Sequence, residues 1–119
     1  MSKKILIIDD DESILDAVSL VLEEEGYIVD VMLKGDEAFD KIAAFKPDAI
    51  LLDVLMSGKD GRDICRKLKK DEATKNIPVI MISAHPSAKE GAIAVGADAF
   101  LPKPFDTQDL LDMVKKYTS

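Results

Sequence analysis

Short apolar runs that end abruptly in polar residues recur along the whole chain. Runs of about four to six apolar residues are too short for helices but typical of strands buried on both faces. The stretch 49–53 is the clearest, because Ala49 and three further apolar residues lead directly into Asp53. The same pattern predicts strands at 4–8, 27–33, 49–53, 77–82 and 99–101.

Apolar residues between these runs are spaced for one face of a helix. This spacing predicts helices at about 12–25 and 38–45, around 64–68, at about 87–95 and around 110–117. In the fourth of these helices, Gly91 lies in the interior and costs about 1 kcal/mol relative to alanine. Gly26 and Gly96 are expected to stop the helices that precede them, and 54–60 reads as a loop.

Regular alternation of strands and helices predicts an α/β fold, with a doubly wound parallel sheet covered by helices on both faces. The chain has 119 residues, 47% of them apolar and 33% charged, which matches a single globular domain over residues 1–119. In open sheets of this kind, function is found beyond the carboxyl ends of the strands. The residues that follow the apolar runs are therefore the chemical candidates.

Charge and targeting signals narrow the classes of function. A net charge of −7, from 23 acidic and 16 basic side chains, argues against nucleic acid or anionic lipid as a partner. The first apolar run, 5–8, is too short for a signal peptide or a membrane span, so we expect a cytoplasmic protein. Cys65 is the only cysteine, which excludes an internal disulfide and a cysteine zinc site.

Carboxylates follow two of the predicted strands. Asp9 and Asp10 follow the first strand and Asp53 ends the third. Three carboxylates in one crevice would repel each other unless a cation compensates their charge. Magnesium is the expected ion, because it prefers oxygen ligands and is typically held by carboxylates together with a phosphoryl oxygen.

A carboxylate beside magnesium can attack phosphorus and form an aspartyl phosphate, and Asp53 is placed to be that nucleophile. Ser83, after the fourth strand, could donate a hydrogen bond to the phosphoryl group, and Lys103, after the fifth, could supply a positive charge. Each residue also has an ordinary interpretation. Asp10 or Asp11 could cap the first helix, Ser83 could satisfy a loop backbone, and Lys103 could be a solvated surface lysine.

The whole chain resembles a response-regulator receiver domain of the two-component signalling family. The resemblance rests on six segments, namely 5–11, 51–56, 60–61, 83–84, 96–101 and 103–105. It implies a flavodoxin-like sheet of strand order 2-1-3-4-5. It also implies that Asp53 accepts phosphate from a sensor histidine kinase or a histidine phosphotransfer protein, and that the protein then acts on a downstream target without turning over a separate substrate.

Residue roles follow from the same resemblance. Asp9, Asp10 and Asp53 would hold Mg²⁺, with Leu55 contributing only its backbone carbonyl. Ser83 and Lys103 would contact the phosphoryl group, and Ser83 and Phe100 would form the switch, in which the aromatic ring rotates inward when phosphate draws the hydroxyl inward. The Lys103-Pro104 bond is usually cis in the family, whereas sequence alone favours trans.

Several positions depart from the family pattern. Ser57 stands where proline is most frequent, so the loop after Asp53 loses a preset backbone angle. Leu55 and His85 replace polar side chains that influence the attack of water on the phosphate, which predicts a long-lived phosphoryl group. His85 itself reads as a solvent-facing loop residue. The span from Ser83 to Gly96 is about two residues shorter than usual, which predicts a short or shifted fourth helix.

Two other functions use related features. A magnesium-dependent phosphohydrolase could work through the same aspartyl phosphate, but it would need an acid two residues after the nucleophile, where Leu55 stands, and a cap segment. A flavodoxin-like cofactor binder would need a phosphate-binding loop after the first strand, where three carboxylates would repel a flavin phosphate. The phosphohydrolase remains the alternative to a phosphorylation-controlled switch.

Overall fold

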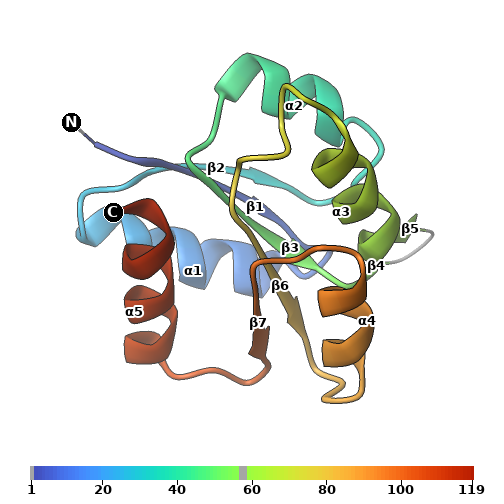
Figure 1. The fold of residues 1–119 in the computed structure, drawn as a ribbon. Coiled ribbons are helices and arrows are strands. Elements are labelled where there is room, and N and C mark those ends of the chain that lie inside the picture. Colours follow the sequence, from blue (N-terminus) through green and yellow to red (C-terminus); the bar gives the residue numbers. More distant parts are fainter. Residues whose placement is uncertain (1, 57–58) are drawn as a thin grey trace.

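The computed structural model describes residues 2–56 and 59–119, and in these residues five strands form one parallel sheet of order β2-β1-β3-β6-β7 (Figure 1). This is the doubly wound order that was expected, so the predicted fold is confirmed. The five strands are β1 (Lys4–Ile8), β2 (Ile28–Met32), β3 (Ala49–Asp53), β6 (Val79–Ser83) and β7 (Ala99–Pro102).

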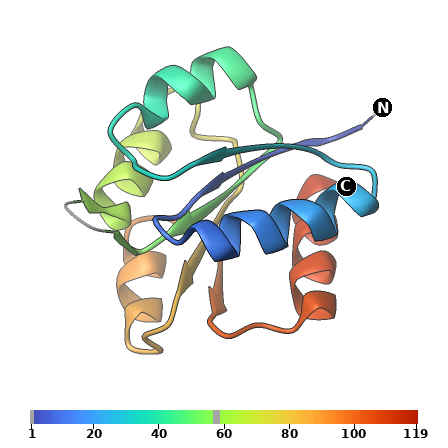
Figure 2. The same ribbon diagram turned by 180° about the vertical axis from the view of Figure 1, so that it is seen from behind.

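Helices cover both faces of this sheet, as Figures 1 and 2 show from opposite sides. One face carries α1 (Glu12–Glu24) and α5 (Thr107–Thr118). The other carries α2 (Ala38–Phe45), α3 (Gly61–Lys70) and α4 (Ala88–Ala94). Alternate residues of each strand point to opposite faces, so Ile5 and Ile7 pack with α1 and α5 while Leu6 and Ile8 pack with α2 and α3.

Glycines end two of the helices in the way that the sequence indicated. Gly26 follows α1 with φ +95°, and Gly96 follows α4 with φ +94°. A left-handed residue after the last turn is adopted at little cost only by glycine. Helix α4 has only seven residues, which confirms the expectation of a short fourth helix.

Within the described residues, the loop expected over 54–60 is the one predicted element that the structure contradicts. It contains a small antiparallel hairpin, β4 (Leu55–Met56) and β5 (Lys59–Asp60), in which Leu55 is paired with Asp60. Two-residue strands carry no periodicity, so a sequence pattern cannot reveal them. Ser57, whose substitution for proline was noted above, lies outside the described residues.

No helix within 2–56 or 59–119 is long and apolar enough to cross a membrane.

Candidate functional site

Three carboxylates converge at the carboxyl ends of the two central strands. Asp9 follows β1 and is fully buried, and Asp53 ends β3 with only 4% of its surface exposed. Asp10 is exposed beside them. One oxygen of each of these three side chains lies within 4.8 Å of the others. The structure therefore brings together the three residues that the sequence singled out as one cluster.

Backbone pairing explains why these side chains meet. Strands β1 and β3 run parallel in register, with Ile8 opposite Leu52, so the residues that follow both strands reach the same edge. The side chain of Asp11 caps α1 by accepting a hydrogen bond from the Ser13 amide at 2.9 Å. Asp9 Oδ1 in turn accepts one from the Asp11 amide at 3.0 Å. The N-cap is thus Asp11, which leaves Asp10 outside that role.

Ser83 and Lys103 reach the same edge from the neighbouring pair of strands. The Lys103 amide donates to the Ser83 carbonyl at 2.8 Å, which ties the two loops together. Ser83 Oγ accepts a hydrogen bond from the His85 amide at 3.0 Å, so its own hydrogen is not used in that contact. The ring of His85 is exposed, as expected. The Lys103-Pro104 peptide bond is cis, which agrees with the resemblance rather than with the general preference for trans.

Lys103 supplies the positive charge next to the cluster. Its ammonium lies 2.9 Å from Asp9 Oδ2 and 3.6 Å from Asp53 Oδ2, and its side chain is 15% exposed. Burial alone would lower the pKa of Lys103, but the contact with Asp9 and the charge of Asp53 raise it above its usual value. Lys103 is therefore a partly buried, permanently charged partner of two carboxylates, and not a solvated surface lysine.

Asp53 is electrostatically disfavoured as an anion. Burial and then the charge of Asp9 raise its pKa to about 7, although Lys103 acts in the opposite direction. Among the residues that the structure describes, the ammonium of Lys103 pairs with both buried carboxylates, Asp9 and Asp53, so that one positive charge meets two negative charges there. Strongly perturbed carboxyl groups of this kind are concentrated at functional sites.

The residues present fit a hard divalent cation. Asp9 Oδ2 is buried and, among the residues that the structure describes, receives no hydrogen bond of good geometry in addition to its ion pair with Lys103. The cluster offers only oxygen atoms, as Mg²⁺ prefers. The backbone carbonyl of Leu55 is an expected further ligand. Leu55 is the first residue of β4, two residues after Asp53, and its side chain is exposed. Asp9, Asp10 and Asp53 could therefore hold the ion.

Gly61 allows α3 to begin directly against the carboxyl end of β3. Its amide donates to the Val54 carbonyl at 2.7 Å, and a Cβ at this position would overlap the carbonyl oxygen of Asp53. A side chain here would displace either the helix or the loop that carries the site. A glycine is therefore needed after Asp60 because there is no room for a side chain, which the sequence alone did not show.

Phe100 lies in the middle of β7, opposite Met81 on β6. It is half-buried and packs against the core on the α2, α3 and α4 side of the sheet, while it also lines a groove with Met113 and Tyr117 of α5. This position is compatible with a ring that moves between core and surface. Its role as a switch remains a prediction.

Comparisons with known proteins agree with this geometry. Residues 5–115 match the family model described as the response regulator receiver domain. A protein of Chloroflexus aurantiacus described as a response regulator is 35% identical, with a TM-score of 0.94 over 99% of this chain and 98% of the other. Chemotaxis protein CheY4 of Vibrio cholerae is 31% identical, with a TM-score of 0.90 over 98% and 99% of the two chains. The receiver domain of a Syntrophus aciditrophicus signal transduction histidine kinase is 33% identical, with a TM-score of 0.90 over 98% and 90%.

Proposed function

The chain belongs to the response regulator receiver domain family of two-component systems, and on this premise we propose that Asp53 accepts a phosphoryl group in a Mg²⁺-dependent reaction. The donor would be a phosphohistidine on a sensor histidine kinase or a histidine phosphotransfer protein. We further propose that the protein works in the cytoplasm as a switch for a downstream protein, without turning over a separate substrate.

The observation that carries this proposal is that two buried carboxylates, those of Asp9 and Asp53, share the ammonium of Lys103. Asp9, Asp10 and Asp53 offer oxygen atoms within 4.8 Å of one another, and Lys103 is the cation paired with Asp9 and Asp53. A site that needed only to be stable would not concentrate like charges in this way. A site that binds a cation and then a phosphoryl group gains from the arrangement.

The reaction would proceed by in-line transfer. A carboxylate oxygen of Asp53 forms a bond to phosphorus while the bond from phosphorus to the donor imidazole nitrogen breaks, and the imidazole keeps that electron pair. When bound by Asp9, Asp10 and Asp53, Mg²⁺ would offset the repulsion between the anionic nucleophile and the anionic donor.

Lys103 and Ser83 would stabilise the transferred group. The ammonium of Lys103 is already 3.6 Å from Asp53 Oδ2, so a small movement would bring it to a phosphoryl oxygen on that atom. Ser83 Oγ retains a hydrogen that it can donate to a second oxygen. Movement of Ser83 toward the phosphate would then open space for Phe100, whose rotation would alter the surface around β7.

The lifetime of the phosphoryl group is expected to be long. Leu55 and His85 occupy the positions from which side chains in the family influence the attacking water. The side chain of Leu55 is apolar, and the ring of His85 is exposed. Rapid loss of phosphate after removal of the donor would contradict this expectation.

Incubation with Mg²⁺ and acetyl phosphate tests the proposal. We expect one phosphoryl adduct that is stable in acid and labile in base, absent from Asp53→Asn and from samples that contain a chelator. Lys70→Met, a change at an exposed lysine far along α3, is the matched control and should be phosphorylated normally. Absence of the adduct from the wild-type protein would refute phosphoryl acceptance, and continuous release of phosphate from unrelated esters would favour the phosphohydrolase.

A further inference from the structure

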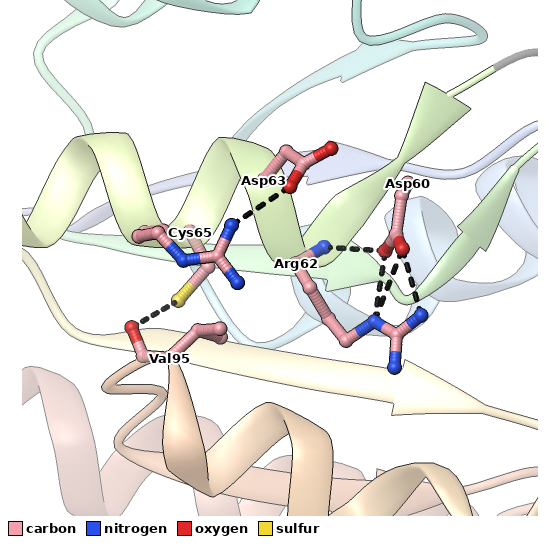
Figure 3. Close-up of polar contacts among 6 residues, drawn as sticks. Asp60, Arg62, Asp63, Cys65 and Val95 are labelled. Carbon is pink, nitrogen blue, oxygen red and sulfur yellow. Dashed lines mark hydrogen bonds and ion pairs between the residues drawn. The ribbon is translucent and has the colours of Figure 1, made fainter.

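Arg62 is held by an unusually complete set of contacts with Asp60 (Figure 3). Its Nε lies 3.0 and 3.1 Å from the two carboxylate oxygens, and Nη2 lies 2.7 Å from Oδ2. Asp60 Oδ1 also accepts the Arg62 amide at 2.9 Å and so caps α3. The contact with Arg62 keeps the pKa of Asp60 below its usual value. The fork geometry holds the guanidinium in one orientation.

Asp60 is tied to the loop that carries the proposed site. It pairs with Leu55 across the β4–β5 hairpin, and the next residue, Gly61, packs directly on the carbonyl of Asp53 and donates to Val54. A change in the backbone of Val54 or Leu55 would therefore be passed to Asp60 through the hairpin. None of these contacts involves Ser83 or Phe100.

The same guanidinium also lies against helix α4. A Cβ placed on Gly91 would come within 3.0 Å of Arg62 Nη1 and 3.2 Å of its Cδ, so the guanidinium and its stem fill the space beside this glycine. The glycine in the interior of α4, costly for a helix of seven residues, thus has a structural reason. A side chain at this position would press on Arg62 and displace it by a few tenths of an ångström.

We propose that Arg62 is a positioning residue that transmits the state of the Asp53 site to α4, by a route separate from Ser83 and Phe100. The inference rests on the proposed function, because it needs Mg²⁺ and a phosphoryl group to change the loop at Leu55. That change shifts Asp60 through the hairpin, Asp60 carries the Arg62 guanidinium with it, and the guanidinium moves against Gly91. Helix α4 then changes its position on the sheet.

A purely local ion pair is the simpler alternative. The side chain of Arg62 is 38% exposed, and surface ion pairs of this kind are often worth less than about 1 kcal/mol. The chain offers a matched comparison, because Arg66 pairs with Asp63 at 2.8 Å one turn further along the same helix. If Arg62 were only a local pair, its removal would have the same consequences as the removal of Arg66.

NMR spectroscopy distinguishes coupling through Arg62 from a purely local ion pair. Spectra of ¹⁵N-labelled protein are recorded with and without Mg²⁺ and beryllium fluoride, which acts as a phosphoryl mimic. The proteins to compare are the wild type, Arg62→Met and the control Arg66→Met. We expect the amides of Ser83 and Lys103 to shift equally in all three. The amides of 92–94 in α4 should shift in the wild type and in Arg66→Met, and by less than half as much in Arg62→Met.

Each result decides between failure of the inference and failure of the proposed function. Equal α4 shifts in Arg62→Met and Arg66→Met overturn the coupling while leaving phosphoryl acceptance intact. Absence of any shift at Ser83 and Lys103 in the wild type overturns the proposed function and the coupling with it. Gly91→Ala disturbs the same contact from the α4 side and should also reduce the α4 response, which provides a second variant if Arg62→Met does not fold.

Discussion

Lys69 and Lys103 are almost equally buried at opposite ends of the sheet, with side chains 17% and 15% exposed, yet their surroundings differ in charge balance. Lys69 lies near the amino ends of β6 and β7. Its ammonium donates to the carbonyls of Lys75 and Ile77 and to Asp98 Oδ2, at 3.3, 2.8 and 2.7 Å. Asp98 Oδ2 also accepts the Val79 amide at 2.8 Å. One positive charge therefore meets one negative charge.

Lys103, at the carboxyl ends, meets two buried carboxylates instead, those of Asp9 and Asp53. The pKa of Asp53 is raised to about 7, and Asp9 Oδ2 lacks a hydrogen bond of good geometry within the described part of the chain. The comparison shows that burial of a lysine does not by itself distinguish structure from function. The balance of charge does distinguish them. A neutral cluster with all its hydrogen bonds made stabilises the fold, whereas a cluster with a surplus of like charge favours the binding of a ligand of opposite charge.

Removal of the balanced lysine should have the largest effect on stability. Lys69→Met leaves Asp98 partly buried without its cation and two carbonyls without a donor, which should cost about 3 kcal/mol. Urea denaturation gives the free energy of unfolding. The neighbouring exposed Lys70→Met should change it by less than about 0.5 kcal/mol. Equal values for the two variants would show that the Lys69 contacts contribute little.

Removal of the unbalanced carboxylate should act in the opposite direction. The folded-state pKa of Asp53, about 7, exceeds the usual 3.8, so the folded protein binds the extra proton and loses stability as the pH rises from about 4 through 7. Asp53→Asn should therefore stabilise the metal-free protein by on the order of 2 kcal/mol at pH 8. Below about pH 4 the difference should vanish. Denaturation at both pH values tests the sign, and a destabilised variant at pH 8 would contradict the surplus of charge.

Addition of magnesium should stabilise the wild-type protein by a smaller amount. At ten times its dissociation constant, an ion that binds only the folded state adds about 1.4 kcal/mol. The increment should persist in Lys69→Met, because that change lies at the other end of the sheet, and should fall in Asp53→Asn. Thermal denaturation with and without Mg²⁺ measures it. An increment lost in Lys69→Met would show that the two ends are not independent.

The smallest effect concerns Gly91, beside the carboxyl-end site. Gly91→Ala should be nearly neutral in the wild type, because its gain in helix propensity is offset by crowding of Arg62. In Arg62→Met the same change should stabilise by up to about 1 kcal/mol, since the closest contact, with Nη1 of the guanidinium, is gone. Urea denaturation of the four proteins of this cycle gives the coupling. Additive changes would show that the two residues do not constrain each other.

Much of the fold could be predicted from periodicity alone. The apolar runs located the strands of the large sheet, and the helical spacing of apolar residues located the helices packed on it. Each of these elements buries one or both faces, and the apolar residues of a buried face recur at a regular spacing in the sequence. The β4–β5 hairpin was missed because two-residue strands have no such spacing. The cis bond before Pro104 was expected only from resemblance, since local preference favours trans.

The site divides in the same way. The sequence by itself determined that the candidate residues lie where strands end, and a parallel sheet brings such residues to one edge. These residues are Asp9, Asp10, Asp53, Ser83 and Lys103. Only the tertiary structure decided that Asp11 caps α1, that Lys103 pairs with Asp9 more closely than with Asp53, and that Arg62 fills the space beside Gly91. Those outcomes depend on distances between side chains from separate elements, which no local pattern of residues encodes.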